Sequence, residues 1–266
     1  MCVSSSNTHN VSRGLSGKYG HLFKKFNTSQ YKYSLPDDID WRTSGAVTSV
    51  KDQLRCSSSY AFAAIGALEG AMALSGDSLV SLSAQNLVDC SVPYGNHGCS
   101  CGNLNSAYLY IIDNEGIDSN YYYQYKSRQL SCNTTNRYKA ASMSGVVSIN
   151  SGDEGTSNQQ WPMLDGSTML TPVTAPSNSK ARGSWTFNCS RSKLTHAMVI
   201  IGYSSGRRTR TWLLKNSAGV QLGINGYIKM VRNKSTQCGG WQLSRRSASH
   251  PMMSSIVSLC ILVVSL

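Results

Sequence analysis

Charged residues are scarce in this chain, at 14% of 266 residues against roughly a quarter in an ordinary soluble protein. This shortage excludes a coiled coil, a charge-rich disordered chain and an acidic tail protein. Acidic residues are the scarcer sign, with 13 Asp and Glu against 25 Lys and Arg and a net charge of +12, which favours an anionic partner. No run of Lys or Arg exceeds two residues, so the basic helix or arm of a nucleic-acid binder is missing and no nucleic acid is expected.

Hydrophobic runs long enough to cross a bilayer are missing as well. The apolar run near the end is too short, so residues 253–266 are expected to form a short apolar tail, and a membrane is not an expected partner. Residues 1–34 hold no apolar core of a signal peptide, and their polar, aperiodic composition is typical of a disordered linker or the remnant of a removed propeptide. One globular domain is expected over residues 35–252.

Cysteine spacing of the kind that binds zinc is also missing, since Cys99 and Cys101 form a C-x-C and no C-x-x-C occurs. We therefore expect neither a metal nor another cofactor. The nine cysteines are nevertheless many for a cytosolic enzyme, and N-x-S/T sequons such as the one at Asn133 fit a secreted chain. An odd number of cysteines leaves at least one thiol free or paired between chains.

Hydrophobic spacing divides the domain into two halves. In the first, apolar residues recur every three or four positions over 59–74, after Ser83 and over 103–115, which predicts three helices. In the second, short apolar or alternating runs at 198–203, 211–214 and 227–231 predict antiparallel strands. We therefore expect an α+β fold with an N-terminal helical lobe, a C-terminal antiparallel β lobe and any site in the cleft between them.

Two local features stand outside these patterns. Residues 155–188 form a long segment that is punctuated by Pro, Ser and Gly and has no regular hydrophobic period, so we interpret them as an atypical segment of the domain. The tyrosines at 121–123 and 125 form an aromatic cluster, which we interpret as packing at a lobe surface rather than a platform for stacking bases.

Ser59 opens the most regular of the predicted helices and can act as a nucleophile. The N-terminus of a helix presents backbone N–H groups and the positive end of the helix dipole, which favour a developing anion. His196 begins the first predicted strand and Asn216 follows the second, about 140 and 160 residues after Ser59, close to the spacing known for a nucleophile, its base and an orienting residue. Each residue alone is more often a cap, a structural histidine or a turn residue, but together they predict a catalytic site.

Many dispersed motifs in one order make the chain resemble the papain-like cysteine proteases, most of all the cathepsin L and S branch. The motifs are Leu35–Arg42, Ser81–Cys90, Tyr94–Cys99, Tyr110–Gly116, His196–Asn216, Gly226–Ile228 and Gln237–Gly239. The resemblance implies a papain-like two-lobe fold. It places Ser59 at the family's nucleophilic cysteine, because Gln53 and the run that follows Ser59 fix the register and Cys56 then matches the family's half-cystine.

The roles of the remaining site residues also come from the resemblance. It implies that His196 is the general base, that Asn216 orients the imidazole, and that Gln53 and the Ser59 N–H stabilise an oxyanion. It further implies the disulfides Cys56–Cys99, Cys90–Cys132 and Cys189–Cys238. Three cysteines are then left over for intermolecular links or as free thiols: Cys2, Cys101 and Cys260.

The serine at the nucleophile position decides the expected function. This serine, Tyr60 and the sequences of segments 66–70 and 142–148 together resemble those of the silicateins. Silicateins are cathepsin-like chains that form the filaments inside biosilica and promote condensation of silicic acid. The similarity implies silicic acid, silicate or a silicon alkoxide as partner, self-assembly into filaments, and a secreted or silica-vesicle location. Arg207, Arg208 and Arg210 are candidate contacts for silicate.

Peptidase activity is expected to be weak or absent. A serine cannot rest as an ion pair with histidine as a cysteine can, and the third residue is a neutral Asn216 rather than a buried aspartate. Two departures from the family argue further against proteolysis: Ala218 stands where a tryptophan shields the site, and Cys101 stands in the glycine-rich substrate loop. The alternatives are a catalytically inactive extracellular structural protein and a weak papain-family peptidase or hydrolase.

Overall fold

A computed structural model describes residues 20–25, 36–134, 139–149, 169–172, 184–185, 196–206, 209–231 and 259–263. The three predicted helices are confirmed as α2 (Ser59–Leu74), α3 (Ala84–Cys90) and α4 (Leu104–Asp113). Helices α3 and α4 begin at polar caps, because the Ser83 and Asn103 side chains each accept a hydrogen bond from a backbone N–H of the first turn. Single 3₁₀ turns, η1 and η3, lie at Gly20–Leu22 and Val92–Tyr94.

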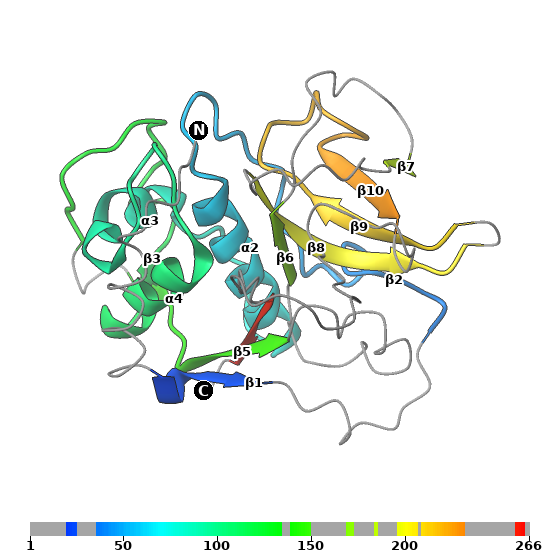
Figure 1. The fold of residues 1–266 in the computed structure, drawn as a ribbon, viewed down its shortest axis with the longest axis horizontal. Coiled ribbons are helices and arrows are strands. Elements are labelled where there is room, and N and C mark those ends of the chain that lie inside the picture. Colours follow the sequence, from blue (N-terminus) through cyan, green and yellow to red (C-terminus); the bar gives the residue numbers. More distant parts are fainter. Residues whose placement is uncertain are drawn as a thin grey trace, which may run out of the picture.

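Helix α2 is buried around most of its circumference, whereas its periodicity predicted one apolar face. It lies between α3 and α4 on one side and the main sheet on the other (Figure 1). Small residues make this close packing possible. A Cβ at Gly66 would lie 2.9 Å from a methyl group of Val199 in the sheet. The helix therefore joins the two halves of the molecule and carries Ser59 at their junction.

The main sheet has the strand order β2-β8-β9-β10-β7, with β6 also paired to β8. The strands at its centre confirm the three predicted runs as β8 (Ala197–Ser204), β9 (Thr211–Lys215) and β10 (Tyr227–Val231), all antiparallel. The flanking strands are β2 (Asp38–Asp40), β6 (Met169–Pro172) and β7 (Ser184–Trp185). Strands β6 and β7 are the described parts of the atypical segment 155–188, whose remainder lies outside the described residues.

Two smaller sheets complete the fold. One has the order β1-β5-β11, formed by Phe23–Lys25, Gly145–Ile149 and Leu259–Val263. The other pairs β3 (Ile117–Asp118) with β4 (Lys139–Ala141). Strand β1 lies in the expected linker and β11 in the expected tail, and both pair with β5. Apart from these two strands and η1, residues 1–34 and 253–266 lie outside the described residues.

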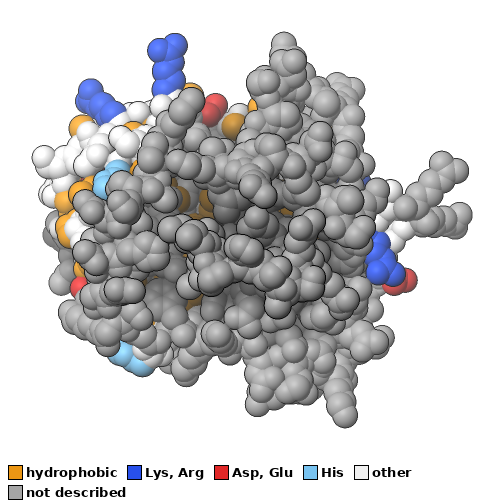
Figure 2. Space-filling model, in the orientation of Figure 1, with side chains coloured by type: hydrophobic (Ala, Val, Ile, Leu, Met, Phe, Trp, Pro, Cys, Tyr) orange, Lys and Arg blue, Asp and Glu red, His pale blue; other side chains and the backbone are white. Residues whose placement is uncertain are grey.

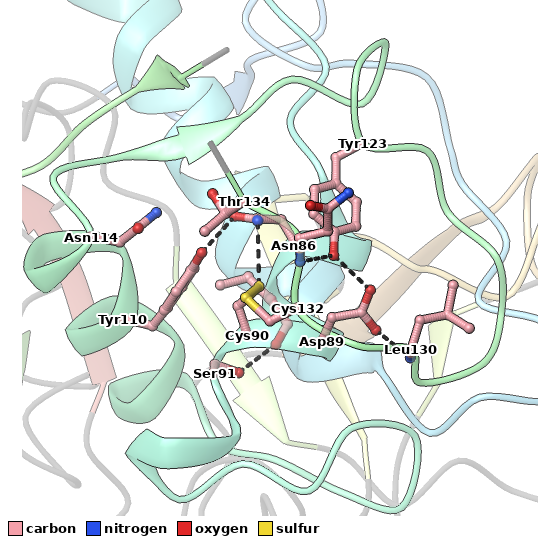
Figure 3. Close-up of a disulfide and its surroundings, with 12 residues drawn as sticks. Asn86, Asp89, Cys90, Ser91, Tyr110, Asn114, Tyr123, Leu130, Cys132 and Thr134 are labelled. Carbon is pink, nitrogen blue, oxygen red and sulfur yellow. Dashed lines mark hydrogen bonds between the residues drawn. A yellow bond between two sulfur atoms is a disulfide. The ribbon is translucent and has the colours of Figure 1, made fainter. Parts of the chain in front are cut away.

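The disulfides Cys56–Cys99 and Cys90–Cys132 are formed, as the resemblance implied. The second anchors the loop that follows β3 to α3 (Figure 3). Asp89 of α3 holds the same loop, since its carboxylate accepts hydrogen bonds from the Tyr123 hydroxyl at 2.9 Å and the Leu130 N–H at 2.7 Å. Cys189, Cys238 and Cys2 lie outside the described residues. Within the described ranges, no helix has the length and hydropathy of a membrane span.

Candidate active site

The four predicted site residues come from three separate parts of the fold. Gln53 lies in the loop before α2, and Ser59 is the first residue of that helix. His196 immediately precedes β8, and Asn216 immediately follows β9. Because β8 and β9 are paired with Val199 opposite Lys215, the two strands bring His196 and Asn216 to the same end of the sheet, next to the start of α2.

His196 and Asn216 are joined by a short hydrogen bond. The Nε2 atom of His196 lies 2.7 Å from Oδ1 of Asn216, which also accepts the Ser217 N–H at 2.8 Å. An amide oxygen can only accept, so the neutral imidazole carries its proton on Nε2 and leaves Nδ1 free to accept one. Burial lowers the pKa of His196, and the hydrogen bond to Asn216 opposes that effect. The predicted orienting role of Asn216 fits this geometry.

Ser59 lies beside His196 but is hydrogen-bonded to the residue after it. The Ala197 N–H donates to the Ser59 Oγ at 3.2 Å, and among the described residues no hydrogen bond joins Ser59 to the His196 ring. Ser59 is 7% exposed. Its own backbone N–H meets no acceptor among the described residues, so it remains available to an oxyanion at the positive end of α2.

Ser58 occupies the N-cap position of α2 without capping it. Its side chain accepts no N–H from the first turn, although serine is a favoured N-cap residue. Instead, the Ser58 Oγ lies 2.7 Å from the Tyr125 hydroxyl, and that hydroxyl donates to the Gln53 carbonyl at 2.9 Å. Tyr125 therefore holds the loop before α2 in place, while the helix terminus keeps free N–H groups.

Gln53 is fixed on both sides of its amide. Its Nε2 donates to the Cys56 carbonyl at 2.9 Å, and its Oε1 accepts the Ser217 hydroxyl at 2.7 Å. Its backbone N–H also donates to the Ser217 carbonyl at 2.7 Å. Only one of the two Nε2 hydrogens is used, so the amide keeps a second one for an oxyanion. These bonds tie the predicted oxyanion residue directly to the Asn216–Ser217 segment.

Cys56 is not an alternative nucleophile, because it is bonded to Cys99 and 1% exposed. Cys101, two residues along the chain from Cys99, is a half-buried free thiol. Burial raises the pKa of the Cys101 thiol, so it is protonated at neutral pH. Gly102 packs so tightly that a Cβ there would lie 2.6 Å from the Tyr60 ring.

A comparison of the sequence with models of known protein families agrees with this arrangement of helix, sheet and histidine–asparagine pair. The model of the papain family of cysteine proteases matches residues 35–246. The chain belongs to the papain family. Silicatein from Petrosia ficiformis is 46% identical over 251 residues, which cover 90% of this chain and 72% of that protein.

Other relatives place the chain in the cathepsin L-like part of the papain family. Digestive cysteine proteinase 2 from Homarus americanus is 44% identical over 76% of this chain, which spans only 63% of that protein's length. The structure of digestive procathepsin L 3 from the Tenebrio molitor larval midgut matches with a TM-score of 0.71 and 34% identity, over 86% of this chain and 76% of that one. The two-lobe α+β fold is therefore established, and the chain is a silicatein homologue.

Sequence reasoning missed a buried charge cluster beneath this papain-family site. Glu69 of α2, 2% exposed, accepts the Thr48 hydroxyl at 2.6 Å and Lys51 Nζ at 3.1 Å. Lys215 Nζ, next to Asn216 in the chain, donates to the Thr48 hydroxyl at 2.7 Å and lies 4.0 Å from Glu69. The signal in the sequence was a lone acidic residue inside an otherwise apolar helix.

Proposed function

We propose that this chain promotes the condensation of silicic acid or a silicon alkoxide to silica at Ser59, His196 and Asn216, and that it assembles into filaments in a secreted or silica-forming compartment. The observation that carries the proposal is the hydrogen bond between His196 Nε2 and Asn216 Oδ1, which leaves Nδ1 available as a base, while the next residue, Ala197, contacts the serine at the N-terminus of α2. The similarity to Silicatein from Petrosia ficiformis supports the choice of silicon as the electrophile.

In the proposed reaction, the Ser59 Oγ forms a bond to silicon while His196 Nδ1 takes its proton. The proton then passes to the departing alkoxide or hydroxide, which leaves as alcohol or water. The hydroxyl of a second silanol then attacks silicon, which forms the Si–O–Si bond and breaks the bond between silicon and the Ser59 Oγ. The proton of that silanol passes through His196 Nδ1 to the Ser59 Oγ, which regenerates the hydroxyl. The Ser59 N–H and the Gln53 Nε2 stabilise the negative oxygen on silicon.

The same geometry explains why peptide hydrolysis is expected to be weak. Asn216 is neutral, so it orients the ring without stabilising an imidazolium as a buried aspartate does, a difference worth about 10⁴ in kcat in serine proteases. Ala218, half-buried beside Asp52, also leaves the His196–Asn216 hydrogen bond without a tryptophan above it. Silicon is a larger and more open electrophile than an amide carbon, so a weakly activated hydroxyl is sufficient for it.

Two other functions compete with this proposal. The bond from the Ala197 N–H to the Ser59 Oγ occupies the hydroxyl without activating it, which favours a catalytically inactive extracellular structural protein. The third candidate function is a weak hydrolase of peptides or esters, which membership of the papain family favours.

One assay separates the three functions. Silica formation from tetraethoxysilane is measured for the native chain, Ser59→Ala and His196→Ala, with Ser57→Ala as the matched control because Ser57 is exposed and outside the site. We expect both site variants to lower the initial rate by about 10²-fold and the control to leave it unchanged. Equal silica from all four proteins would leave a structural role, and peptide cleavage that disappears with Ser59→Ala would support a hydrolase.

A further inference from the structure

An open hollow of about 590 Å³ lies on the helical half of the molecule. Two segments, Val80–Ser81 and Ser119–Tyr121, form most of its wall, and Gln124 and Tyr125 complete it. Neither Ser59 nor His196 lines it, so it is separate from the proposed reaction site. Its volume falls within the range of sites that hold small organic ligands.

Backbone hydrogen bonds fix the walls of this hollow. The Asn120 N–H donates to the Ser81 carbonyl at 2.7 Å, and the Ser83 N–H donates to the Asp118 carbonyl at 2.9 Å, so the two segments run antiparallel. The Tyr123 N–H closes a turn onto the Ser119 carbonyl at 3.1 Å. The hollow is therefore formed in advance, and little ordering is needed when a ligand binds.

The lining is neutral, with hydroxyl and amide groups beside apolar surface. None of the lining residues carries a formal charge at neutral pH. The Tyr121 side chain is 77% exposed and offers an aromatic ring next to the polar groups. Ser119 is 8% exposed, and its hydroxyl has no hydrogen-bond partner among the described residues. A buried hydroxyl without a partner is unfavourable, and a ligand hydroxyl that pairs with it would remove that cost.

We propose that this hollow binds a neutral oligosaccharide. A sugar ring has hydroxyl groups around its edge and an apolar C–H face, which match the amides of Asn120 and Gln124 and the ring of Tyr121. Rotation about χ1 turns the Ser119 hydroxyl toward the ligand. The neutral lining disfavours phosphorylated or sulfated sugars. Orthosilicic acid shares the hydroxyl groups but has no apolar face to place on Tyr121.

The binding test uses the full chain and calorimetric titration with a panel of neutral trisaccharides, including cellotriose and chitotriose, and with orthosilicic acid as a separate arm. We expect at least one trisaccharide to bind with a Kd of about 1 mM or tighter, and Tyr121→Ala and Gln124→Ala to weaken it about tenfold. Leu130→Ala is the control, because Leu130 is an exposed apolar residue that does not line the hollow, whereas the Tyr122 ring packs against that of Tyr121. We expect it to bind as the native chain does.

Ser119→Ala gives a second readout that a structural role would not produce. It removes an unpaired buried hydroxyl, so the thermal midpoint of the free protein should stay the same or rise while trisaccharide binding weakens. No binding of any trisaccharide at about 10 mM, equal binding by Tyr121→Ala, or binding of orthosilicic acid alone would overturn the proposal. None of these outcomes depends on the reactivity of Ser59.

Discussion

His196 shows how the surroundings of one residue set its chemistry. Burial lowers its pKa more than the hydrogen bond to Asn216 raises it, so the imidazole is neutral at physiological pH. A neutral imidazole can take a proton from a hydroxyl. It does not rest as the imidazolium of a cysteine–histidine ion pair. A neutral imidazole at this position is therefore compatible with the base-assisted serine chemistry that we propose, and not with the family's thiolate mechanism.

The pH dependence of the proposed silica formation should follow from this shift. As pH falls through the folded-state pKa of His196, Nδ1 gains a proton and the base is lost. The acid limb of the rate profile should therefore have its midpoint below the ordinary histidine value of 6.5. Asn216→Ala removes the hydrogen bond that raises the pKa, so it should move the midpoint lower still. Initial rates corrected for a His196→Ala background test this, and a midpoint above 6.5 would contradict it.

The candidate site residues are chosen from the sequence, but their contacts could not be predicted from it. Ser59, His196 and Asn216 stand in recognisable motifs, and the structure brings two of them into hydrogen-bond contact. The bond from the Ala197 N–H to Ser59 depends on where β8 meets α2, which no local pattern encodes. Likewise, Ser58 is a good cap by composition, yet its hydroxyl bonds Tyr125 from a distant loop.

At the scale of elements, the buried charge cluster connects the parts of the fold that carry the site. Glu69 belongs to α2 with Ser59, Lys215 ends β9 beside Asn216, and Lys51 lies in the loop that leads to Gln53. Thr48 accepts from both lysines and donates to Glu69. A change in this cluster therefore acts on the relative placement of the site residues rather than on one element.

Removing the negative charge of the cluster should lower the free energy of unfolding more than removing one of its positive charges. Glu69→Gln removes the carboxylate that pairs with Lys51 and Lys215 and leaves the buried Lys215 ammonium without a counter-charge, so it should lower the free energy of unfolding by about 3 kcal/mol. Lys215→Met leaves Glu69 paired with Lys51 and Thr48, so it should be close to neutral. Urea denaturation at pH 7 measures both. Equal losses in the two variants would show that the cluster is not organised around Glu69.

The native chain and Lys215→Met should also differ in how their stability depends on pH. Burial lowers the pKa of Lys215 to about 8, with Glu69 opposing and Lys51 adding to the shift. Between about 8 and the ordinary 10.5, the unfolded chain binds more protons at Lys215 than the folded chain does, so this residue makes stability rise with pH. That rise should be present in the native chain and absent in Lys215→Met.

The element boundaries were largely predictable, whereas the packing between elements was not. Periodicity predicts α2 because apolar residues recur at helical spacing, but it cannot show that the opposite face of the helix is also covered by a sheet. Lys215 and Thr48 are separated by 167 residues, and only the fold makes them neighbours. The tyrosine cluster was predicted to pack at a lobe surface. Tyr123 and Tyr125 are half-buried, but Tyr121 stands exposed at the rim of the hollow.

At the scale of the whole molecule, the positive charge is distributed rather than gathered in a run. On the described part of the face in Figure 2, Lys and Arg side chains project at the periphery of the molecule. Arg210 is exposed, whereas Arg207 and Arg208 lie outside the described residues. We expect a net charge of +12 to attract silicate species and a silica surface whatever the state of Ser59. The proposed catalysis and an attraction by charge can therefore be tested separately.

Adsorption to silica particles tests the contribution of the net positive charge separately from any reaction at Ser59. Silica is negatively charged at pH 8, and the range of an electrostatic attraction falls from about 10 Å at 0.1 M salt to about 3 Å at 1 M. The native chain and Ser59→Ala should therefore adsorb equally to silica particles at low salt, and both should be released as salt rises. Succinylation of the lysines, which reverses their charge, should abolish adsorption at low salt. Salt-insensitive adsorption, or a loss specific to Ser59→Ala, would show that the serine rather than the +12 charge holds the mineral.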